Sequence, residues 1–466
     1  MPTPAADADL VLRSRRVVTP DGQRPATIVV RAGRIEAVLD RAGAPAGPVT
    51  DVGDLVVLPG LVDSHVHVNE PGRTHWEGFA TATAAAALGG VTTLVDMPLN
   101  SLPPTIDPAA LAAKRDAAGP QAHVDIGFWG GVVPGSEDHL GALHDAGVFG
   151  FKAFLCGSGV AEYGDFAPDA VASLAQRVAA LDALLIVHAE HPDLVAAASA
   201  EVDASHPDPR RYTSWLDGRP PAAEEAAIAA LVDAARATGA RIHVLHLSAA
   251  GGAALIAAAR AEGLPVTVET CPHYLTLAAE DVPDGATAFK CAPPIRDRAN
   301  RDALWAALAD GTIDAIVSDH SPAPAADKAL DTGDLLAAWG GIASLQLGLP
   351  AVWTAAAERG HTLDDVVRWM SAGPARLLGA RRKGAIVAGA EADLVVFDPE
   401  ATWTVDAARL AHRHPVTPYD GQRLRGVVRT TYLAGRPIAH GRVDGDRFDG
   451  EVVDPPRGRL RTRGDL

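Results

Sequence analysis

The chain has 466 residues, of which 48% are hydrophobic and 21% charged, proportions that are ordinary for a soluble globular protein. This length exceeds one average domain and suits a large barrel that carries an accessory domain. The formal net charge of −17 disfavours polyanions such as nucleic acid as partners. Charges interrupt the alanine-rich stretches well before membrane-spanning length, so we expect no membrane partner either.

Short strands separated by turns are expected in the first part of the chain, at 10–18, 27–31, 34–38 and 54–58. From Gly60 onward, short apolar runs alternate with alanine-rich segments of helical length. Eight such runs occur, at 61–68, 91–97, 124–132, 148–155, 184–189, 242–247, 266–270 and 313–318. Helices are expected between most of them, for example at 76–88, 168–180, 222–238 and 252–262. Eight strand–helix units predict a (β/α)8 TIM barrel, whose strands are continuously apolar because both of their sides are buried.

Short strands return after Gly384, at 392–398, 426–434 and 436–440. We therefore predict an α/β fold in which residues 58–383 form the barrel. Residues 1–57 and 384–466 together are predicted to form a small β-sandwich accessory domain. The tail at 454–466 is rich in Pro, Arg and Gly, and is expected to be an arm or disordered.

Cysteine usage and the N-terminal composition indicate the compartment. Only three cysteines occur, Cys156, Cys271 and Cys291, and none belongs to a Cys-x-x-Cys motif. A sparse and odd number argues against a disulfide framework and fits a reducing cytoplasm. Residues 1–7 show no basic start followed by an apolar core, so we expect no signal peptide.

Potential metal ligands stand at or near the ends of the apolar runs. They are His65, His67, Lys152, His188, His246 and Asp319. Parallel barrels assemble their active sites from the ends of several strands, and four imidazoles with a carboxylate are a transition-metal donor set. An ammonium group would repel metal ions, but carboxylation of the lysine by carbon dioxide gives a carbamate whose two oxygens can bridge two cations. The sequence therefore predicts a binuclear metallohydrolase.

Several of these positions have competitors. His191 competes with His188 but lies beyond the strand end, and His243 stands three residues before His246 and so faces the opposite side. The lysine could instead be a buried ion-pair partner. Asp319 could cap a helix before Ser-Pro, but as a ligand it could also accept a proton from the water that a metal activates. Residues expected to support the ligands are Asp96, Glu190, Glu269, His273 and His320.

These motifs resemble the amidohydrolase superfamily, and in particular its cyclic amidohydrolases. The resemblance covers essentially the whole chain, including the segment 57–65 before the paired histidines and the segment 383–399 after the barrel. It implies that a carboxylated Lys152 bridges two divalent ions, zinc above all. His65 and His67 with Asp319 would hold one ion, and His188 with His246 the other. It also implies a small-molecule substrate and a homo-oligomer, which we expect to be a tetramer.

Within these enzymes the choice lies among allantoinases, dihydroorotases and dihydropyrimidinases or hydantoinases. The segment 67–73 looks like that of allantoinases, whereas dihydroorotases place an arginine where Asn69 stands. Hydantoinases carry a tyrosine five residues after the lysine, where this chain has Gly157. The segments 96–101, 290–297 and 338–343 also look allantoinase-like.

The resemblance thus implies allantoin, a neutral compound rich in hydrogen-bonding groups, as the substrate. Its expected contacts are Asn69, Gly157, Ser158 and Cys291. The alternative of another class is a metal-free scaffold relative of the same fold. Such relatives have lost ligands that this chain retains.

Overall fold

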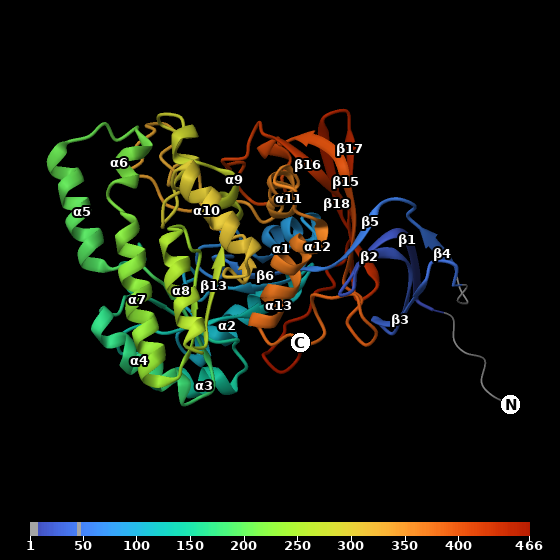
Figure 1. Ribbon diagram of the computed structural model, residues 1–466, viewed down its shortest axis with the longest axis horizontal. Coiled ribbons are helices and arrows are strands. Elements are labelled where there is room, and N and C mark those ends of the chain that lie inside the picture. The colour runs from blue at the N-terminus through green and yellow to red at the C-terminus, as the bar shows by residue number, and fades with distance from the viewer. Residues whose placement is uncertain (1–7, 44–47) are drawn as a thin grey trace.

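A ring of parallel strands occupies the middle of the computed structural model, which describes residues 8–43 and 48–466 (Figure 1). The strands are β6 (Leu61–Val66), β7 (Val91–Asp96), β8 (Asp125–Phe128), β9 (Gly130–Gly131), β10 (Phe151–Phe154), β11 (Leu184–His188), β12 (Arg241–Val244), β13 (Val266–Thr270) and β14 (Ala315–Ile316). Each falls inside one of the predicted apolar runs, with β8 and β9 sharing the third, except that β12 begins one residue early. Nearly all of their residues are buried, as expected for strands covered on both sides.

The ring closes through hydrogen bonds beyond the regular ladders. The strands pair in parallel as β6-β7-β8 and as β9-β10-β11-β12-β13-β14. Strand β8 is joined to the segment just before β10, because Phe149 N donates to Phe128 O at 3.1 Å. The segment after β14 is joined to the segment after β6, because His67 N donates to His320 O at 2.9 Å. The predicted (β/α)8 barrel is therefore confirmed.

Helices pack around this ring and carry the chain from one strand to the next. They are α1 (Phe79–Leu88), α2 (Pro108–Ala118), α3 (Leu140–Asp145), α4 (Val171–Ala179), α5 (Pro192–Ser205), α6 (Tyr212–Leu216), α7 (Pro221–Thr238), α8 (Gly251–Ala261), α9 (Pro272–Thr276), α10 (Arg298–Ala309), α11 (Gly348–Glu358), α12 (Leu363–Val367) and α13 (Gly373–Leu377). Helix α1 begins three residues later than predicted, because Gly78 precedes it with a φ of 119°. Among the helices of the described residues, none combines the length and apolarity needed to cross a bilayer.

Both ends of the chain contribute to one further sheet, which stands to the right of the barrel in Figure 1. Its strands are β1 (Leu10–Thr19), β2 (Gly22–Arg31), β3 (Arg34–Asp40), β4 (Val49–Asp51), β5 (Val56–Pro59), β15 (Leu394–Thr404), β16 (Arg423–Leu433), β17 (Arg436–Asp444) and β18 (Arg447–Val452). Strand β5 joins the two ends, because it pairs in parallel with β1 and antiparallel with β15. The accessory domain shared by both ends is confirmed, and hydrogen bonds link all nine strands of this sheet.

The tail at 454–466 is an arm that lies against the start of β8. Ile126 N donates to Arg459 O at 2.9 Å, and Arg461 N donates to Ile126 O at 2.7 Å. The Arg461 guanidinium lies 2.6 Å from a carboxylate oxygen of Asp125 and of Glu391. Of the two alternatives predicted for this segment, the structure therefore shows the arm. The segment at 1–7, in which we expect no signal peptide, lies outside the described residues.

The lysines of this chain share an unusual location. There are five, and each is at most 6% exposed: Lys114, Lys152, Lys290, Lys328 and Lys383. Lys383 lies where the barrel, the terminal sheet and the arm meet. Its Nζ lies 2.7 Å from Asp125, 2.9 Å from Glu391 and 2.5 Å from Asp393. The domain limits of 1–57, 58–383 and 384–466 stay a prediction.

Candidate metal centre

The predicted ligands converge at the end of the barrel where the parallel strands finish. His65 lies in β6, Lys152 in β10 and His188 at the end of β11. His246 follows β12 by two residues, and Asp319 follows β14 by three. These side chains and that of His67 belong to residues that are between 0 and 8% exposed. The structure thus brings all six predicted ligands into one buried region.

Two of these residues have left-handed backbone conformations. The φ of His246 is 37° and that of Asp319 is 43°. Non-glycine residues rarely adopt such values, which cost about 1–3 kcal/mol each and cluster at functional sites. This backbone turns the two side chains away from the direction that a continuing strand would give them.

Asp319 lies between His65, which is in β6, and His67, which follows the end of that strand. Its Oδ1 is 3.2 Å from His65 Nε2 and 3.4 Å from His67 Nε2. On its other side, His65 Nδ1 lies 2.6 Å from Glu269 Oε1. Because a carboxylate there accepts the Nδ1 proton, the Nε2 lone pair is left free for a cation. Burial lowers the pKa of His67 to about 3, so this ring too is neutral and able to bind a metal.

His188 and His246 form a second pair. His188 Nδ1 lies 3.0 Å from His246 Nε2, while His188 Nε2 lies 2.7 Å from Glu190 Oε2. At this distance one ring donates an N–H to the other, and the same two nitrogens are also able to bind a metal ion. Burial lowers the pKa of His188, but Cys156 and Glu190 more than offset burial and raise it to about 9. Burial also holds the pKa of His246 well below its usual value.

Lys152 is buried beside both histidine pairs. Its Nζ lies 4.9 Å from the centre of the Phe154 ring, and its charge lowers the pKa of His67 and of His246. Burial lowers the pKa of Lys152 to about 8, although Asp319 and Glu269 oppose the shift. An amine with a lowered pKa is more often uncharged near neutral pH, the form that reacts with carbon dioxide.

The donor set fits divalent metal ions. The buried His65 Nε2 faces Asp319 without a hydrogen-bond partner, and both ring nitrogens of the neighbouring His273 are also without one. Imidazole nitrogens together with a carboxylate suit zinc and similar ions. A different acidic cluster, Asp125, Glu391 and Asp393, does not need a metal, because Lys383 and Arg461 neutralise it.

The supporting residues named from the sequence have different surroundings. Glu269 contacts His65 and also His243, whose Nε2 lies 3.0 Å from Glu269 Oε2. His243 therefore supports His65 through Glu269, a role that the sequence analysis did not predict. Glu190 contacts His188, whereas His191 stands at the start of α5 outside the cluster.

The side chains of the remaining three supporting candidates make no hydrogen bond to a predicted ligand among the described residues. Asp96 is paired with Lys114 at 2.7 Å and accepts a hydrogen bond from Val68 N. His320 Nε2 lies 3.3 Å from Glu77 Oε2. His273 makes no hydrogen bond through its ring.

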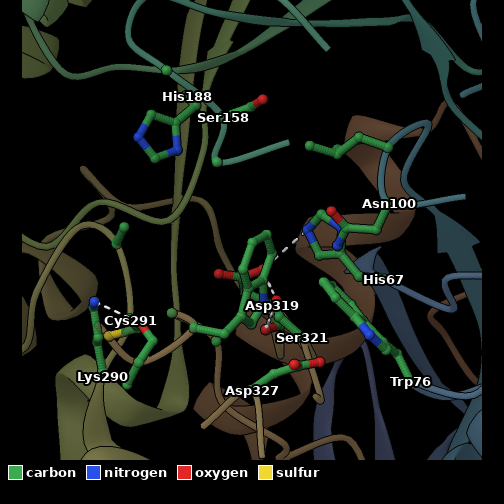
Figure 2. Close-up of a pocket in the computed structure, with 18 of the residues that line it drawn as sticks. His67, Trp76, Asn100, Ser158, His188, Lys290, Cys291, Asp319, Ser321 and Asp327 are labelled. Carbon is green, nitrogen blue, oxygen red and sulfur yellow. Dashed lines mark hydrogen bonds and ion pairs between the residues drawn. The ribbon is translucent and has the colours of Figure 1, made fainter. Parts of the chain in front are cut away.

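A cavity of about 700 Å³ opens above this centre (Figure 2). Five of the six ligands reach its wall, His65 being the exception. Gly157, Ser158 and Cys291, which the sequence analysis names as substrate contacts, also line it. Burial raises the pKa of the Cys291 thiol to about 12, so the thiol stays protonated. Asn69 is buried with both side-chain polar atoms unpaired, and it is not among the residues that line the cavity.

Other lining residues were missed by the sequence analysis. They include Trp76, Asn100, Trp215, Arg219, Lys290 and Trp339. Asn100, Lys290 and Trp339 lie within segments that resemble allantoinases, which was the available signal. Trp215 and Arg219 come from the connection around α6, where nothing in the local pattern marks a functional side chain.

Comparisons with known proteins bear on this centre. The model of a family described as the amidohydrolase family matches residues 56–438. The chain belongs to the amidohydrolase family. It is 56% identical to an allantoinase of Streptomyces avermitilis, over 98% of this chain and 99% of that protein. It is 44% identical to an allantoinase of Arabidopsis thaliana, over 92% and 87% of the respective chains.

Solved structures agree with this membership. An L-hydantoinase (dihydropyrimidinase) from Arthrobacter aurescens matches with a TM-score of 0.90 and 30% identity. The match covers 98% of this chain and 100% of that chain. A dihydropyrimidinase from Brevibacillus agri matches with a TM-score of 0.86 and 26% identity, over 98% and 99% of the two chains. The amidohydrolase resemblance seen in the sequence is confirmed, and the chain is an enzyme of this hydrolase family.

Proposed function

We propose that this chain hydrolyses the hydantoin-ring amide of allantoin to give allantoate, using two divalent metal ions. The observation that carries the proposal is the convergence of two histidine pairs, Asp319 and a buried lysine beneath one cavity. Allantoinases that are 56% and 44% identical over nearly the whole chain support the choice of substrate.

We propose that zinc is the metal and that Lys152 is carboxylated. His65, His67 and Asp319 would hold one ion, His188 and His246 the other, and the carbamate of Lys152 would lie between them. Divalent ions in such a site acidify water and polarise a carbonyl group. The carboxylates of Glu269 and Glu190 hold the rings of His65 and His188 in place.

Asp319 is the proposed general base and acid. Despite burial, the neighbouring imidazoles hold the pKa of Asp319 well below its usual value, so the group is a carboxylate near neutral pH. Ser321 Oγ donates to Asp319 Oδ1 at 2.9 Å and fixes its orientation. Asp319 takes a proton from the attacking water and delivers it to the leaving ring nitrogen.

The substrate contacts proposed from the sequence lie on loops. No tyrosine stands at the position of Gly157, and Tyr163 donates its hydroxyl to Lys152 O at 2.7 Å, away from this role. Ser158 Oγ donates to Tyr163 O at 2.6 Å, so its side chain shapes the loop, and main-chain amides of 157–159 would stabilise an oxyanion. Asn69, whose buried amide lacks partners, stays a proposed contact.

Other proposed features rest on the sequence and on the family resemblance. We propose that the chain assembles as a homotetramer, works in the cytoplasm and serves purine catabolism. We keep the proposed division into a barrel at 58–383 and an accessory domain formed by 1–57 and 384–466. Light scattering of the purified protein would test the tetramer directly.

A substrate panel on metal-replete protein tests the activity. Allantoin should be hydrolysed far faster than unsubstituted hydantoin or dihydrouracil, and dihydroorotate should be inert. A site built to pair with polar substrate groups discriminates by roughly 10⁴–10⁵ against analogues that lack them. If dihydropyrimidines were the best substrates, the chain would be a dihydropyrimidinase. Absence of bound metal and of all four activities would favour the metal-free scaffold.

A further inference from the structure

Three cationic side chains line the cavity above the candidate centre: Lys152, Arg219 and Lys290. Lys152 belongs to the proposed centre itself. Lys290 Nζ donates to Leu336 O at 2.9 Å and to Ala338 O at 2.6 Å, so carbonyl groups already occupy it. Arg219 is therefore the cation whose role in the cavity is unexplained.

The guanidinium of Arg219 is held in place on two sides. Its Nη1 contacts Glu190 Oε2, and its central carbon lies 4.9 Å from the centre of the Trp215 ring. The Arg219 carbonyl accepts a hydrogen bond from Arg296 Nη1 at 3.1 Å, which fixes the main chain between α6 and α7. Its side chain is nevertheless 15% exposed, and it contributes to the cavity wall.

Arg219 is also close to the proposed centre. Glu190 Oε2 contacts both Arg219 and His188, so one carboxylate separates the guanidinium from a proposed ligand. A planar guanidinium carries five N–H donors in a rigid fork. Because Glu190 is the only carboxylate that pairs with Arg219 among the described residues, N–H groups remain for a molecule in the cavity.

We propose that Arg219 is a specificity-determining residue that donates to the carbonyl oxygen of the exocyclic ureido arm of the substrate. The inference rests on the proposed function. The ring carbonyl that is attacked must lie at the centre, so the arm extends into the remaining cavity. Its oxygen is a neutral acceptor that suits a guanidinium already neutralised by Glu190.

Arg219→Met and Arg219→Lys test this inference, with Arg211→Met as the matched control, because Arg211 is an exposed arginine that does not line the cavity. Hydantoin lacks the ureido arm, so kcat/KM is measured for allantoin and for hydantoin with each variant. Loss of a hydrogen bond to a charged group should lower kcat/KM by about 10- to 100-fold. Arg219→Met should lower kcat/KM for allantoin by that factor more than for hydantoin, and Arg219→Lys should recover part of the difference.

Arg211→Met should instead leave both values near those of the wild type, because the Arg211 side chain is exposed outside the cavity. Titration calorimetry provides a readout that needs no turnover. Arg219→Met should weaken the binding of allantoate, which has two ureido groups, more than the binding of N-carbamoylglycine, which has one. Metal content is measured in every variant. Equal losses on both substrates and both ligands would overturn the proposal and leave Arg219 a positioning residue. Wild-type protein without allantoin hydrolysis would instead overturn the proposed function itself.

Discussion

Replacement of Lys383 with methionine should destabilise the junction between the barrel, the terminal sheet and the C-terminal arm. The ammonium of Lys383 lies within 2.9 Å of three carboxylates, those of Asp125, Glu391 and Asp393. The side chains of Lys383 and Asp125 are 1% exposed, so water does not replace the lost interaction. In the variant, Arg461 would still pair with Asp125 and Glu391, and Arg382 with Glu391, but Asp393 would lose the one ion-pair partner that it has among the described residues.

The expected loss is large for one side chain. Removing one partner of a buried ion pair costs about 3–5 kcal/mol, because an uncompensated charge remains in the interior. Unfolding entropy is about 2.1 cal/mol/K per residue, so a chain of 466 residues loses about 1 °C in Tm for each kcal/mol. We therefore expect the Tm of Lys383→Met to fall by about 3–5 °C in scanning calorimetry.

The loss should depend on pH with a defined sign. In the wild type, burial raises the pKa of Asp125, but Lys383 and Arg461 more than offset burial and hold it below its usual value. Its contribution is present above the unfolded pKa of about 4 and is lost only as pH falls below that value. Without Lys383, burial raises the carboxyl pKa values above those of the unfolded chain. The variant then loses stability as pH rises through these raised values, so its Tm deficit should be greater at pH 8 than at pH 5.

Arg442→Met is a matched control that removes one positive charge from an exposed ion pair. The side chains of Arg442 and Asp449 are 77% and 40% exposed, and such pairs contribute about 0–1 kcal/mol. A Tm change within about 1 °C is expected there. A Lys383→Met variant that unfolded at the wild-type temperature, or whose deficit grew toward low pH, would refute this account of the junction.

Further predictions concern the proposed centre. Lys152→Ala should lose activity and bound metal, both measured on the same sample, with partial rescue by short-chain carboxylic acids; full activity without added acid would contradict a carboxylated lysine. Asp319→Asn should lower kcat by at least the 10²–10⁴-fold that is typical of a general acid–base group, and near-normal turnover would exclude the proposed proton transfer. Asn69→Arg should strongly lower kcat/KM for allantoin without creating dihydroorotase activity, and wild-type kinetics in this variant would remove Asn69 from the substrate contacts.

Positions at strand ends were predictable from the sequence because two local signals coincide there. An apolar run fixes where a barrel strand ends, and a histidine, lysine or aspartate at that end must then face the active side. This argument locates His65, Lys152, His188 and Asp319 without any knowledge of the loops. It also favours His246 over His243, because His246 is nearer the end of its apolar run; the direction of the His246 side chain is set by a left-handed backbone beyond the end of β12, which the run does not predict.

Loop residues and edge strands were not predictable in the same way. Trp215 and Arg219 reach the cavity through a connection that has no hydrophobic period, so their partners are set by tertiary contacts alone. Strand β18 contains Gly450 and alternates weakly, and it forms because β17 supplies a ladder of hydrogen bonds. The arm at 454–466 is ordered by Asp125 and Glu391, which lie far from it in the sequence.

The burial of every lysine has a practical consequence for handling this protein. Reagents that acylate primary amines, and the common crosslinkers and dyes built on them, would find lysine side chains only at the cavity wall, where Lys152 and Lys290 lie. Labelling of Lys114, Lys328 and Lys383 under native conditions would require the fold to open, and its rate would measure that opening. Surface coupling of the folded enzyme should instead be directed to its carboxylates or arginines.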